Sequence, residues 1–275
     1  MAEKGTGLFL GDTEITAIQN DKFVFANPFE STPPIAWNFR TDANASDLVF
    51  ATPGNKVSDI GMTYAWSDVQ ADIRGTGSNK SVLTSNLTTS TRNNFASDGY
   101  TESTEVSSTA AFLNANDSTY SFGADDWTFE AYLNIGTQSG STFQRAIFSD
   151  YTAANAAQSA LWLRMDGGKL QIITGKAGGG ENFYQSAVQT WGTNTWHHIA
   201  FTRDGSTLNA YFDGTRIINQ TYTFTLNTTT VGKYLMGYYN EAQDTVDVQD
   251  YRIYKGFAKY TTSSFTPPLS MGLYE

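Results

Sequence analysis

Short runs in which apolar and polar residues alternate organise this chain. The clearest two runs cover Trp196–Arg203 and Thr207–Phe212, and they flank Asp204-Gly205. Successive side chains of a strand point to opposite faces, and glycine accepts the positive φ of a tight turn, so this pattern predicts a β-hairpin. A second Asp-Gly pair at 213–214 leads into a further run at 216–222. The stretch is therefore predicted to be a three-stranded meander.

The same period of two recurs along the chain. Residues 127–135 alternate Trp127 and Phe129 with Thr128 and Glu130, which predicts a strand buried on one face only. Asp166-Gly167-Gly168 separates two further runs and predicts a second hairpin. Other strands are predicted at 7–18 (a hairpin turning at Gly11-Asp12), 22–26, 47–51, 145–150, 183–188, 233–239 and 247–254, with loops or edge strands over 84–109. Many short strands joined by turns predict an all-β sandwich or jelly roll.

A proline-rich break near residue 30 divides the chain. Asn27-Pro28 and Pro33-Pro34 end a short strand region that has too few apolar residues to form a core alone. We expect an N-terminal β arm and linker at 1–34, a main domain at 35–268 and a tail at 269–275. The arm either packs on the main domain or anchors the chain to another protein. The candidate anchoring residues are Leu8, Phe9, Leu10, Ile15, Phe23 and Phe25.

Composition supports a packed fold and disfavours several partners. The 275 residues are 40% hydrophobic and 14% aromatic, which is enough for a sizeable core. The formal net charge of −10 disfavours nucleic acid and anionic membranes, although it could equally serve solubility alone. The chain has no cysteine, which excludes disulfides and thiolate metal sites. Its first residues lack a signal sequence and no apolar span is long enough to cross a membrane, so we expect synthesis in a cytosol without membrane insertion.

Five motifs of the predicted strands occur in a fixed order along the chain. They are Asp126-Trp127-Thr128-Phe129-Glu130-Ala131-Tyr132, Asn194-Thr195-Trp196-His197-His198-Ile199-Ala200, Asp204-Gly205-Ser206-Thr207-Leu208, Tyr211-Phe212-Asp213-Gly214 and Asp250-Tyr251-Arg252-Ile253-Tyr254. Together they resemble strand motifs of laminin-G-like, concanavalin A-like jelly-roll domains. The resemblance covers roughly residues 47–268 and implies that fold for the main domain. One loop departs from the family pattern: Phe112-Leu113-Asn114-Ala115-Asn116 replaces the usual stretch with Asp-Gly, which puts any ligand or ion of that loop in doubt.

The two ends of the chain are similar to ends of tailed-bacteriophage virion proteins. These ends are Leu8–Ile15 and the stretch Lys255–Thr261 followed by Phe265-Thr266-Pro267-Pro268. The resemblance implies a virion component displayed on the outer surface of the particle and made in the host cytoplasm, as a tail fibre, capsid fibre or decoration protein. Other virion proteins and further copies of the chain would be its partners.

The residues give little support to catalysis. His197 and His198 are the only histidines, and as strand neighbours they face opposite sides, so they cannot share a metal; we expect structural roles for them. No Gly-x-Ser-x-Gly elbow is present, and no run of alternating acids suggests the carboxylate pair of a retaining glycosidase. We therefore predict a protein that is not an enzyme.

Loop aromatics and acids are the remaining candidates for binding. Trp127 and Trp196 are predicted to be core, whereas aromatics near strand ends could stack on sugar rings at the rim of the jelly roll. The resemblance also implies that calcium could bind there through Asp side chains and carbonyls. The acids near predicted strand ends are Asp150, Asp166, Asp213, Asp244 and Asp247, and none of them is assigned as a ligand. The candidate ligand-binding aromatics are Tyr151, Tyr184, Trp191 and Tyr239.

The function predicted from these observations is adhesion without catalysis. The chain would be a phage virion structural protein whose jelly-roll domain binds host or environmental surface glycans. One alternative is a purely structural decoration or adaptor protein without a ligand. The other is a glycan depolymerase.

Overall fold

The computed structural model describes residues 44–52, 87–95, 102–106, 118–150, 160–175, 180–227, 233–237 and 243–268, together with the backbone of strands at 8–10, 13–19, 22–25 and 113–114. The chain divides into two compact units, residues 1–36 and residues 37–275. No helix among the described residues is long and apolar enough to cross a membrane. The sequence-based domain limits of 34 and 268 stay predictions, and the tail at 269–275 lies outside the described residues.

The N-terminal unit is a three-stranded antiparallel sheet. Its strands are β1 (Leu8–Leu10), β2 (Thr13–Gln19) and β3 (Lys22–Phe25), in the order β1-β2-β3. Leu10 pairs with Thr13, so β1 and β2 form the predicted hairpin, while its turn residues 11 and 12 lie outside the described residues. The six candidate anchoring residues lie on these strands, but their side chains are outside the described part of the chain.

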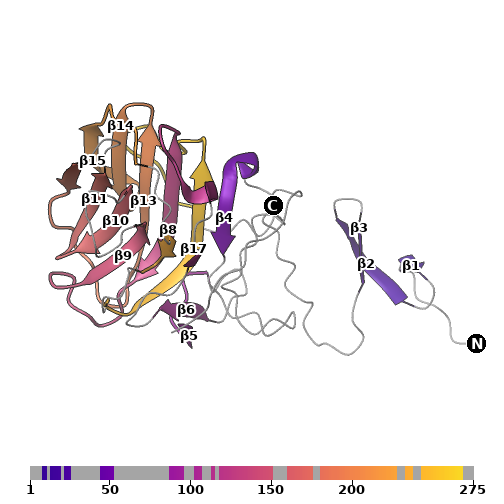
Figure 1. Cartoon of the computed structure of the whole chain (residues 1–275). Coiled ribbons are helices and arrows are strands. Elements are labelled where there is room, and N and C mark those ends of the chain that lie inside the picture. The colour runs from indigo at the N-terminus through magenta and orange to yellow at the C-terminus, as the bar shows by residue number, and fades with distance from the viewer. Residues whose placement is uncertain are drawn as a thin grey trace, which may run out of the picture. The chain divides into compact units, whose positions relative to one another are not determined.

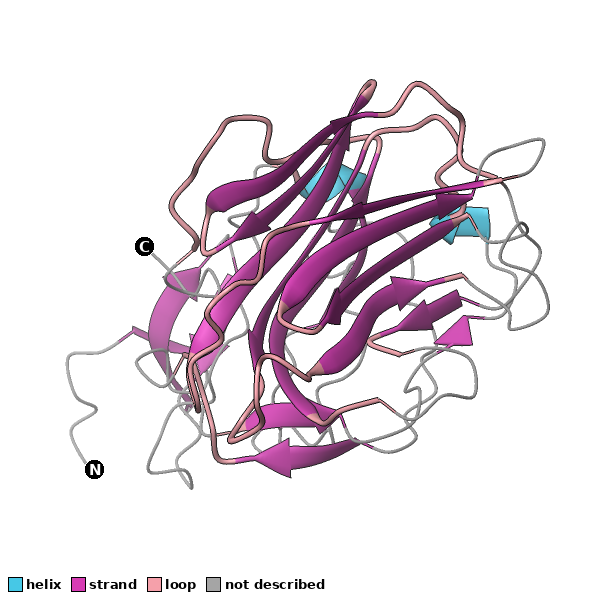
Figure 2. Ribbon diagram, turned by 90° about the vertical axis from the view of Figure 1, so that its left-hand side faces the viewer, coloured by secondary structure: helices cyan, strands magenta, loops and turns pink. Residues whose placement is uncertain are grey.

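The second unit is a sandwich of two sheets, and the prediction of an all-β fold is confirmed (Figures 1 and 2). The eight-stranded sheet has the order β15-β14-β13-β8-β17-β6-β5, with β4 also paired to β17. Its strands are β4 (Leu48–Thr52), β5 (Leu87–Ser90), β6 (Ser103–Val106), β8 (Trp127–Asn134), β13 (Trp196–Asp204), β14 (Thr207–Phe212), β15 (Thr215–Thr221) and β17 (Val246–Lys255).

The second sheet of the sandwich has six strands in the order β12-β11-β10-β9-β16-β7. Both predicted hairpins are present: Asp204 pairs with Thr207 in the meander, and Asp166 pairs with Lys169 in the other. Single 3-10 turns at Ala45–Asp47 and Ser118–Tyr120 complete the described elements. The strands of this sheet are β7 (Leu113–Asn114), β9 (Gln144–Ser149), β10 (Leu161–Asp166), β11 (Lys169–Gly175), β12 (Glu181–Gln185) and β16 (Lys233–Leu235).

The hydrophobic core fills the space between the two sheets. Alternate residues of β8 face it, and Phe129 packs on Phe148 of the opposite sheet with ring centroids 4.8 Å apart. Phe122 contacts both rings, at 5.3 and 5.8 Å. Burial of such aromatic side chains removes much apolar surface from water and therefore stabilises the sandwich.

The prediction that β8 is buried on one face only is wrong, because all eight of its residues are buried. Its polar face is covered by residues 257–268, which cross the outside of the eight-stranded sheet. Tyr260 and Phe265 of that segment stack with centroids 3.6 Å apart and pack on Ala200 and Tyr211. Alternation along β8 thus identified the two faces correctly but could not show that a distant segment covers the second.

Some strand limits also differ from those predicted. Residues 87–90 form an edge strand, as one of the two options left open for 84–109 had it, whereas residues 103–106 form an inner strand between β5 and β17. β12 ends at Gln185, and the next residues bond to the hairpin of β10 and β11, with Ser186 N donating to Leu170 O of β11 and Gln189 N to Gly168 O of the turn. Trp127 is fully buried as expected, whereas Trp196 is only half-buried.

Candidate functional site

The outward face of the six-stranded sheet carries an apolar row across three strands. Phe183 of β12 pairs with Ile173 of β11, which pairs with Trp162 of β10, so their side chains share one face. Phe183 is 48% exposed, Trp162 is half-buried and Ile173 between them is 8% exposed. Since neighbouring strands lie about 4.8 Å apart, the two aromatic positions are separated by roughly 10 Å across the sheet.

β10 also contributes polar side chains to this outward face, because its residues alternate between the core and the outside. Leu161, Leu163 and Met165 point into the core, which turns Trp162 and Arg164 outward. The Arg164 guanidinium lies over the Trp162 ring with Cζ 4.2 Å from the ring centroid. Such a cation–π contact keeps the arginine flat against the indole.

Arg164 is fixed by a side chain of β11 and by one of its own strand. Its Nε donates to Oε1 of Gln171 at 2.5 Å, and its Nη2 lies 3.0 Å from Oδ2 of Asp166. Nε2 of Gln144 donates to Oδ1 of Asp166 at 2.9 Å. The result is a row of pre-oriented amide, guanidinium and carboxylate groups beside an aromatic ring, with Arg164 and Asp166 each about one quarter exposed.

This combination suits a polar ligand that also has an apolar face. A pyranose ring can stack its C–H face on an indole, while its hydroxyl groups bond to amides and charged groups beside the ring. The face was missed in the sequence-based search, which considered only loop aromatics. The signal was present, because the alternation of Leu161–Asp166 already placed Trp162, Arg164 and Asp166 together on the polar side.

The predicted ligand-binding aromatics do not form a common stacking surface in the described part of the chain. Trp191 is buried, with Nε1 donating to Gly168 O at 3.3 Å and its ring packed on His197 and Phe212. Its expected exposure is therefore wrong, because the bonds of residues 186–189 to the turn after β10 draw the indole inward. Tyr184 pairs with Ile172 and packs against the core. Tyr151 and Tyr239 lie outside the described residues, and a binding role for these four residues stays a prediction.

The two histidines point to opposite sides of β13, as predicted. His197 Nδ1 is 2.8 Å from Oδ2 of Asp213, on the side of the core. His198 Nε2 is 3.4 Å from Oε2 of Glu130, on the outer side of the eight-stranded sheet. Each imidazole thus has a separate acidic neighbour, and both histidines are buried.

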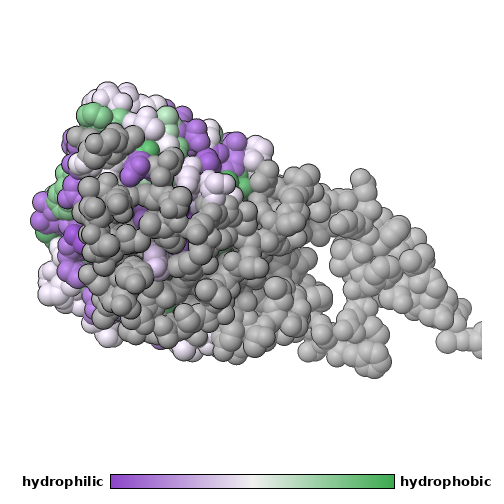
Figure 3. Space-filling view, viewed as in Figure 1, coloured by the Kyte–Doolittle hydropathy of each residue, from purple (hydrophilic) through white to green (hydrophobic). Residues whose placement is uncertain are grey.

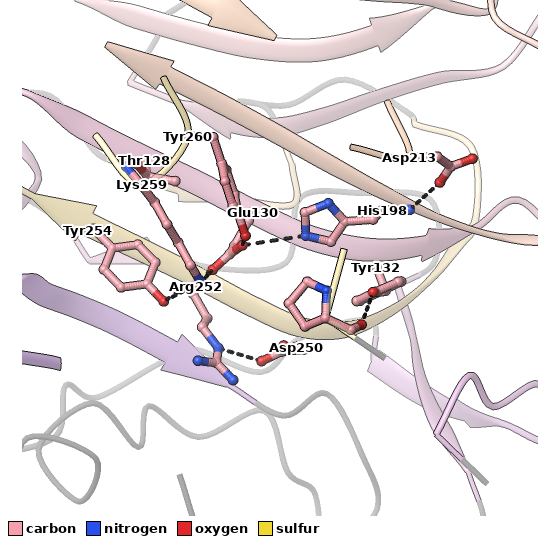
Figure 4. A network of polar contacts seen from close by, with 11 residues as sticks. Thr128, Glu130, Tyr132, His198, Asp213, Asp250, Arg252, Tyr254, Lys259 and Tyr260 are labelled. Atoms are coloured by element: carbon pink, nitrogen blue, oxygen red, sulfur yellow. Dashed lines mark hydrogen bonds and ion pairs between the residues drawn. The ribbon is translucent and has the colours of Figure 1, made fainter. Parts of the chain in front are cut away.

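Glu130 is the centre of a polar network under residues 257–268 (Figure 4). It accepts from Lys259 Nζ at 2.6 Å, Tyr260 OH at 2.5 Å and Tyr254 OH at 3.1 Å. Burial alone would raise the pKa of Glu130, but Lys259 and His198 outweigh it and hold the pKa well below its usual value. Only 3% of Glu130 is exposed, so this carboxylate joins the C-terminal segment to the sheet and does not meet a ligand.

The five candidate calcium ligands are dispersed, and each has another partner. No three acidic or histidine side chains come together in the part of the chain that the structure describes. Asp150 lies 3.5 Å from Lys233 Nζ and accepts two backbone N–H groups, Asp247 binds Arg92, Asp213 binds His197, Asp166 binds Arg164, and Asp244 accepts from Gln144 N. The five aspartates therefore do not share one site among the described residues, and calcium binding stays a prediction.

Comparison with known proteins agrees with this architecture. A family model described as the Concanavalin A-like lectin/glucanases superfamily matches residues 107–258, more than half of the chain. The chain belongs to this superfamily. The predicted laminin-G-like, concanavalin A-like fold is therefore confirmed. No match was found among the curated proteins.

Solved structures with similar folds include binding domains of clostridial toxins. The binding domain of Paraclostridial Mosquitocidal Protein 1 superposes with a TM-score of 0.55 at 13% identity, over 76% of this chain and 49% of that one. The botulinum neurotoxin serotype D ligand-binding domain in complex with N-acetylneuraminic acid gives a TM-score of 0.52 at 14% identity, over 77% and 48%. The chain thus spans about half the length of these structures, and at such identities the likeness concerns the fold.

Proposed function

We propose that the jelly-roll domain is an adhesion module that binds glycans on the outward face of the six-stranded sheet. The observation that carries the proposal is the half-buried Trp162 with Arg164 fixed across it. Membership of a superfamily of lectins and glucanases supports a carbohydrate ligand. The structure of a similar domain in complex with N-acetylneuraminic acid supports it further.

The same face gives reasons to propose binding without hydrolysis. Glycosidases place two carboxyl groups about 5–9.5 Å apart. β10, β11 and β12 carry two acids, Asp166 and Glu181, whose partners on β11 are Lys169 and Gly175. Six residues of strand separate those partners, which corresponds to about 20 Å. The pair is therefore too far apart to act on one glycosidic bond.

Asp244 and Asp166 are the acids on which the alternative function, a glycan depolymerase, can be tested. Gln144 binds Asp244 through its backbone N–H and Asp166 through its side chain, so these two acids approach the same residue. Incubating the full chain with the polysaccharides that it binds, and following reducing ends, tests for turnover. Release of reducing ends that stops in Asp166→Asn would establish a depolymerase instead.

We further propose that the domain is displayed on the outer surface of a tailed-phage virion, with residues 1–34 as the anchoring arm. The support is the similarity of both chain ends to virion proteins and the division of the chain into two units at residue 36. A single glycan site of about millimolar affinity contributes roughly 4 kcal/mol, so adhesion would depend on many copies in one particle. Particles assembled with a chain lacking residues 1–30 should then lack the domain, although the truncated chain remains folded.

Replacing Trp162 tests the glycan site directly. On a glycan array, Trp162→Ala should lose at least tenfold in affinity, because the stacking surface is removed. Its melting temperature should change little, since the side chain is only half-buried. Phe224→Ala is the matched control: Phe224 is 45% exposed but lies in the chain that follows β15, a strand of the other sheet, and its replacement should leave binding intact. Unchanged binding by Trp162→Ala would place the site elsewhere.

A further inference from the structure

A third aromatic residue lies on the row of Phe183 and Trp162. Trp162 pairs with Ser149 of β9, and Ser149 pairs with Tyr234 of β16, so Tyr234 points to the same outward face of the sheet. Tyr234 is half-buried, whereas both of its neighbours along β16 are buried. The row therefore crosses five adjacent strands, in the order β12-β11-β10-β9-β16, and the first, third and fifth strands each contribute an aromatic ring.

The three rings are evenly spaced. Neighbouring strands lie about 4.8 Å apart, so Phe183, Trp162 and Tyr234 follow one another at intervals of roughly 10 Å, over about 19 Å in all. The residues between them, Ile173 and Ser149, are buried and have shorter side chains than the rings. One sugar unit of an extended chain is about half as long as one interval, so every second unit would lie on a ring.

A shift of register in β9 keeps the row continuous. The pairing of β9 with β10 shifts after Leu163, and the adjacent residues Ile147 and Phe148 both belong to the core. Without this shift, Phe148 would stand opposite Trp162 in the place of Ser149. The irregularity thus puts a small side chain between two aromatic positions.

A polar row runs parallel to the aromatic one. Gln185 of β12 pairs with Gln171 of β11, which pairs with Arg164 of β10. Each of the three lies two residues along its strand from the aromatic row, a distance of about 7 Å. Their amide and guanidinium groups can bond to hydroxyl groups along one edge of a chain whose sugars stack on the rings.

The charges of this face favour a neutral ligand. Among the outward residues of these five strands, two are cations and two are anions, so their charges cancel. The chain as a whole has a formal net charge of −10, which repels polyanions. The four charged residues are Arg164, Lys169, Asp166 and Glu181.

The twist of the sheet favours a single chain over a solid surface. Neighbouring strands are rotated by roughly 20–25°, so rings two strands apart differ in direction by about 40–50°. A flat crystalline surface cannot contact all three rings at once. A single chain can follow them, because it turns about its glycosidic bonds.

A protein partner suits the row less well. Protein interfaces bury about 800 Å² on each partner around an apolar centre. The coloured surface in Figure 3 is mainly hydrophilic or neutral, with small separate hydrophobic areas. On the outward face itself, Phe183 is 48% exposed, but the polar row lies directly beside it.

We infer that this face binds one extended, neutral polysaccharide chain, which runs across the strands and stacks on Phe183, Trp162 and Tyr234. The inference rests on the proposed glycan function and goes beyond it, because it assigns Tyr234 to the site and specifies the length, direction and charge of the ligand. Six sugar units cover all three rings, whereas two units cover only one. Sugars within a chain are bound, and a chain end is not required.

The dependence of affinity on chain length tests this inference. The probes are oligomers of β1→4-linked glucose, mannose, xylose and N-acetylglucosamine with two, four and six units, titrated calorimetrically into the full-length protein. Affinity in at least one series should rise about tenfold or more from two units to six, because the longer chain reaches further rings. A six-unit polyuronate, which is anionic, and a six-unit α1→4-linked glucose chain, which is wound, should bind no better than the disaccharides.

The result separates this inference from the proposed function. If no series gains affinity with length while the wild-type protein binds other glycans on an array, the inference is overturned and the proposed function stands. If no glycan is bound at all, both are overturned. Retention on microcrystalline cellulose or chitin without affinity for the soluble oligomers would identify a flat surface as the ligand and would also overturn the inference.

Substitutions test the outer rings separately. Phe183→Ala and Tyr234→Ala should each lower the affinity for the six-unit chain about threefold to tenfold and leave the affinity for the disaccharide unchanged. Trp162→Ala should lower both affinities. Val188→Ala is the control, since Val188 is 61% exposed but lies outside the row. If Tyr234→Ala does not fold, Phe183→Ala provides the test alone. Unchanged binding of the six-unit chain by Phe183→Ala, or equal losses for both ligands, would overturn the inference.

Discussion

The outward faces of the two sheets have similar sequence patterns, but one face is buried by the chain itself and the other stays partly exposed. On the eight-stranded sheet, Thr128, Glu130 and Tyr132 point away from the core, yet all are buried under residues 257–268. On the six-stranded sheet, Trp162 and Arg164 occupy equivalent outward positions in β10 and stay partly open. Both faces carry an aromatic residue, a cation and an acid, but in one the polar groups bind the chain itself.

This difference shows that a polar sheet face can be either part of the fold or available for binding. Under residues 257–268, the hydrogen bonds to Glu130 are shielded from water. A polar group that loses its partner there lowers the stability strongly, because water cannot replace the partner. On the open face, water competes for the same kinds of groups, so each contact contributes little to stability. Substitutions on the covered face should therefore lower stability more than binding, and substitutions on the open face should lower binding more than stability.

The largest effect is expected from removing the central charge of the covered face. Glu130→Gln leaves Lys259 and His198 without their carboxylate, and loss of one partner from such a buried network costs about 3 kcal/mol. Asp166→Asn, the matched change on the open face, should cost less than about 1 kcal/mol. Urea denaturation measures both. Equal losses for the two variants would contradict the proposed difference between the faces.

Gly214 tests how firmly residues 257–268 are attached. It has φ +76°, accepts from Phe265 N, and lies so close to the Phe265 carbonyl that a Cβ atom could not fit. Gly214→Ala should cost at least about 2 kcal/mol, the sum of backbone strain and displacement of the segment. Gly205→Ala is the control, since Gly205 has φ +54° but open space at the Cβ position. A similar loss of unfolding free energy in both would mean that the segment adapts without cost.

The features that could be predicted from the sequence are those that depend on interactions between residues close together along the chain. The hairpins at 161–174 and 196–212 were predictable because Asp-Gly turns and alternation act over a few residues. The burial of Glu130 was not, because it depends on Lys259 and Tyr260, which lie about 130 positions further along the chain. The exposure of Trp191 was mispredicted for the same reason: residues 186–189 bond to a turn that precedes them by almost twenty positions.

The candidate site was missed for a different reason, since its pattern is local. Trp162 was assigned to a hairpin strand, and sheet faces were assumed to be committed to the core. That assumption holds for one face of each strand only, and nothing in the sequence marks which outward face remains open. The structure supplied this missing fact, because residues 257–268 cover the eight-stranded sheet, whereas Phe183, Trp162 and Arg164 stay partly exposed on the other.

The pH dependence of stability should separate the two faces further. The folded pKa of Glu130 lies well below its usual value near 4.5, so its stabilising contribution is complete above about pH 4.5 and is lost as the pH falls through the folded pKa. The difference in unfolding free energy between wild type and Glu130→Gln should therefore shrink below pH 4.5. Measurements of urea midpoints from pH 7 to pH 3 check this. A difference that stays constant over the range would show that Glu130 is not held as a low-pKa carboxylate.

The smallest effect on stability, with a clear effect on binding, is expected from Arg164→Lys on the open face. Lysine keeps the charge near Asp166 but cannot lie flat over Trp162 while donating to Gln171, because its ammonium is a compact group on a flexible stem. The unfolding free energy should change by less than about 0.5 kcal/mol, since the pair is solvent-accessible and screened by salt. Glycan affinity should fall about threefold to tenfold, because the fixed donors beside the indole are lost. Lys255→Arg, which changes a cation of β17 on the other sheet, is the control for a general effect of charge type. Loss of stability above 1 kcal/mol in Arg164→Lys would show that this face is as much a part of the fold as the covered one.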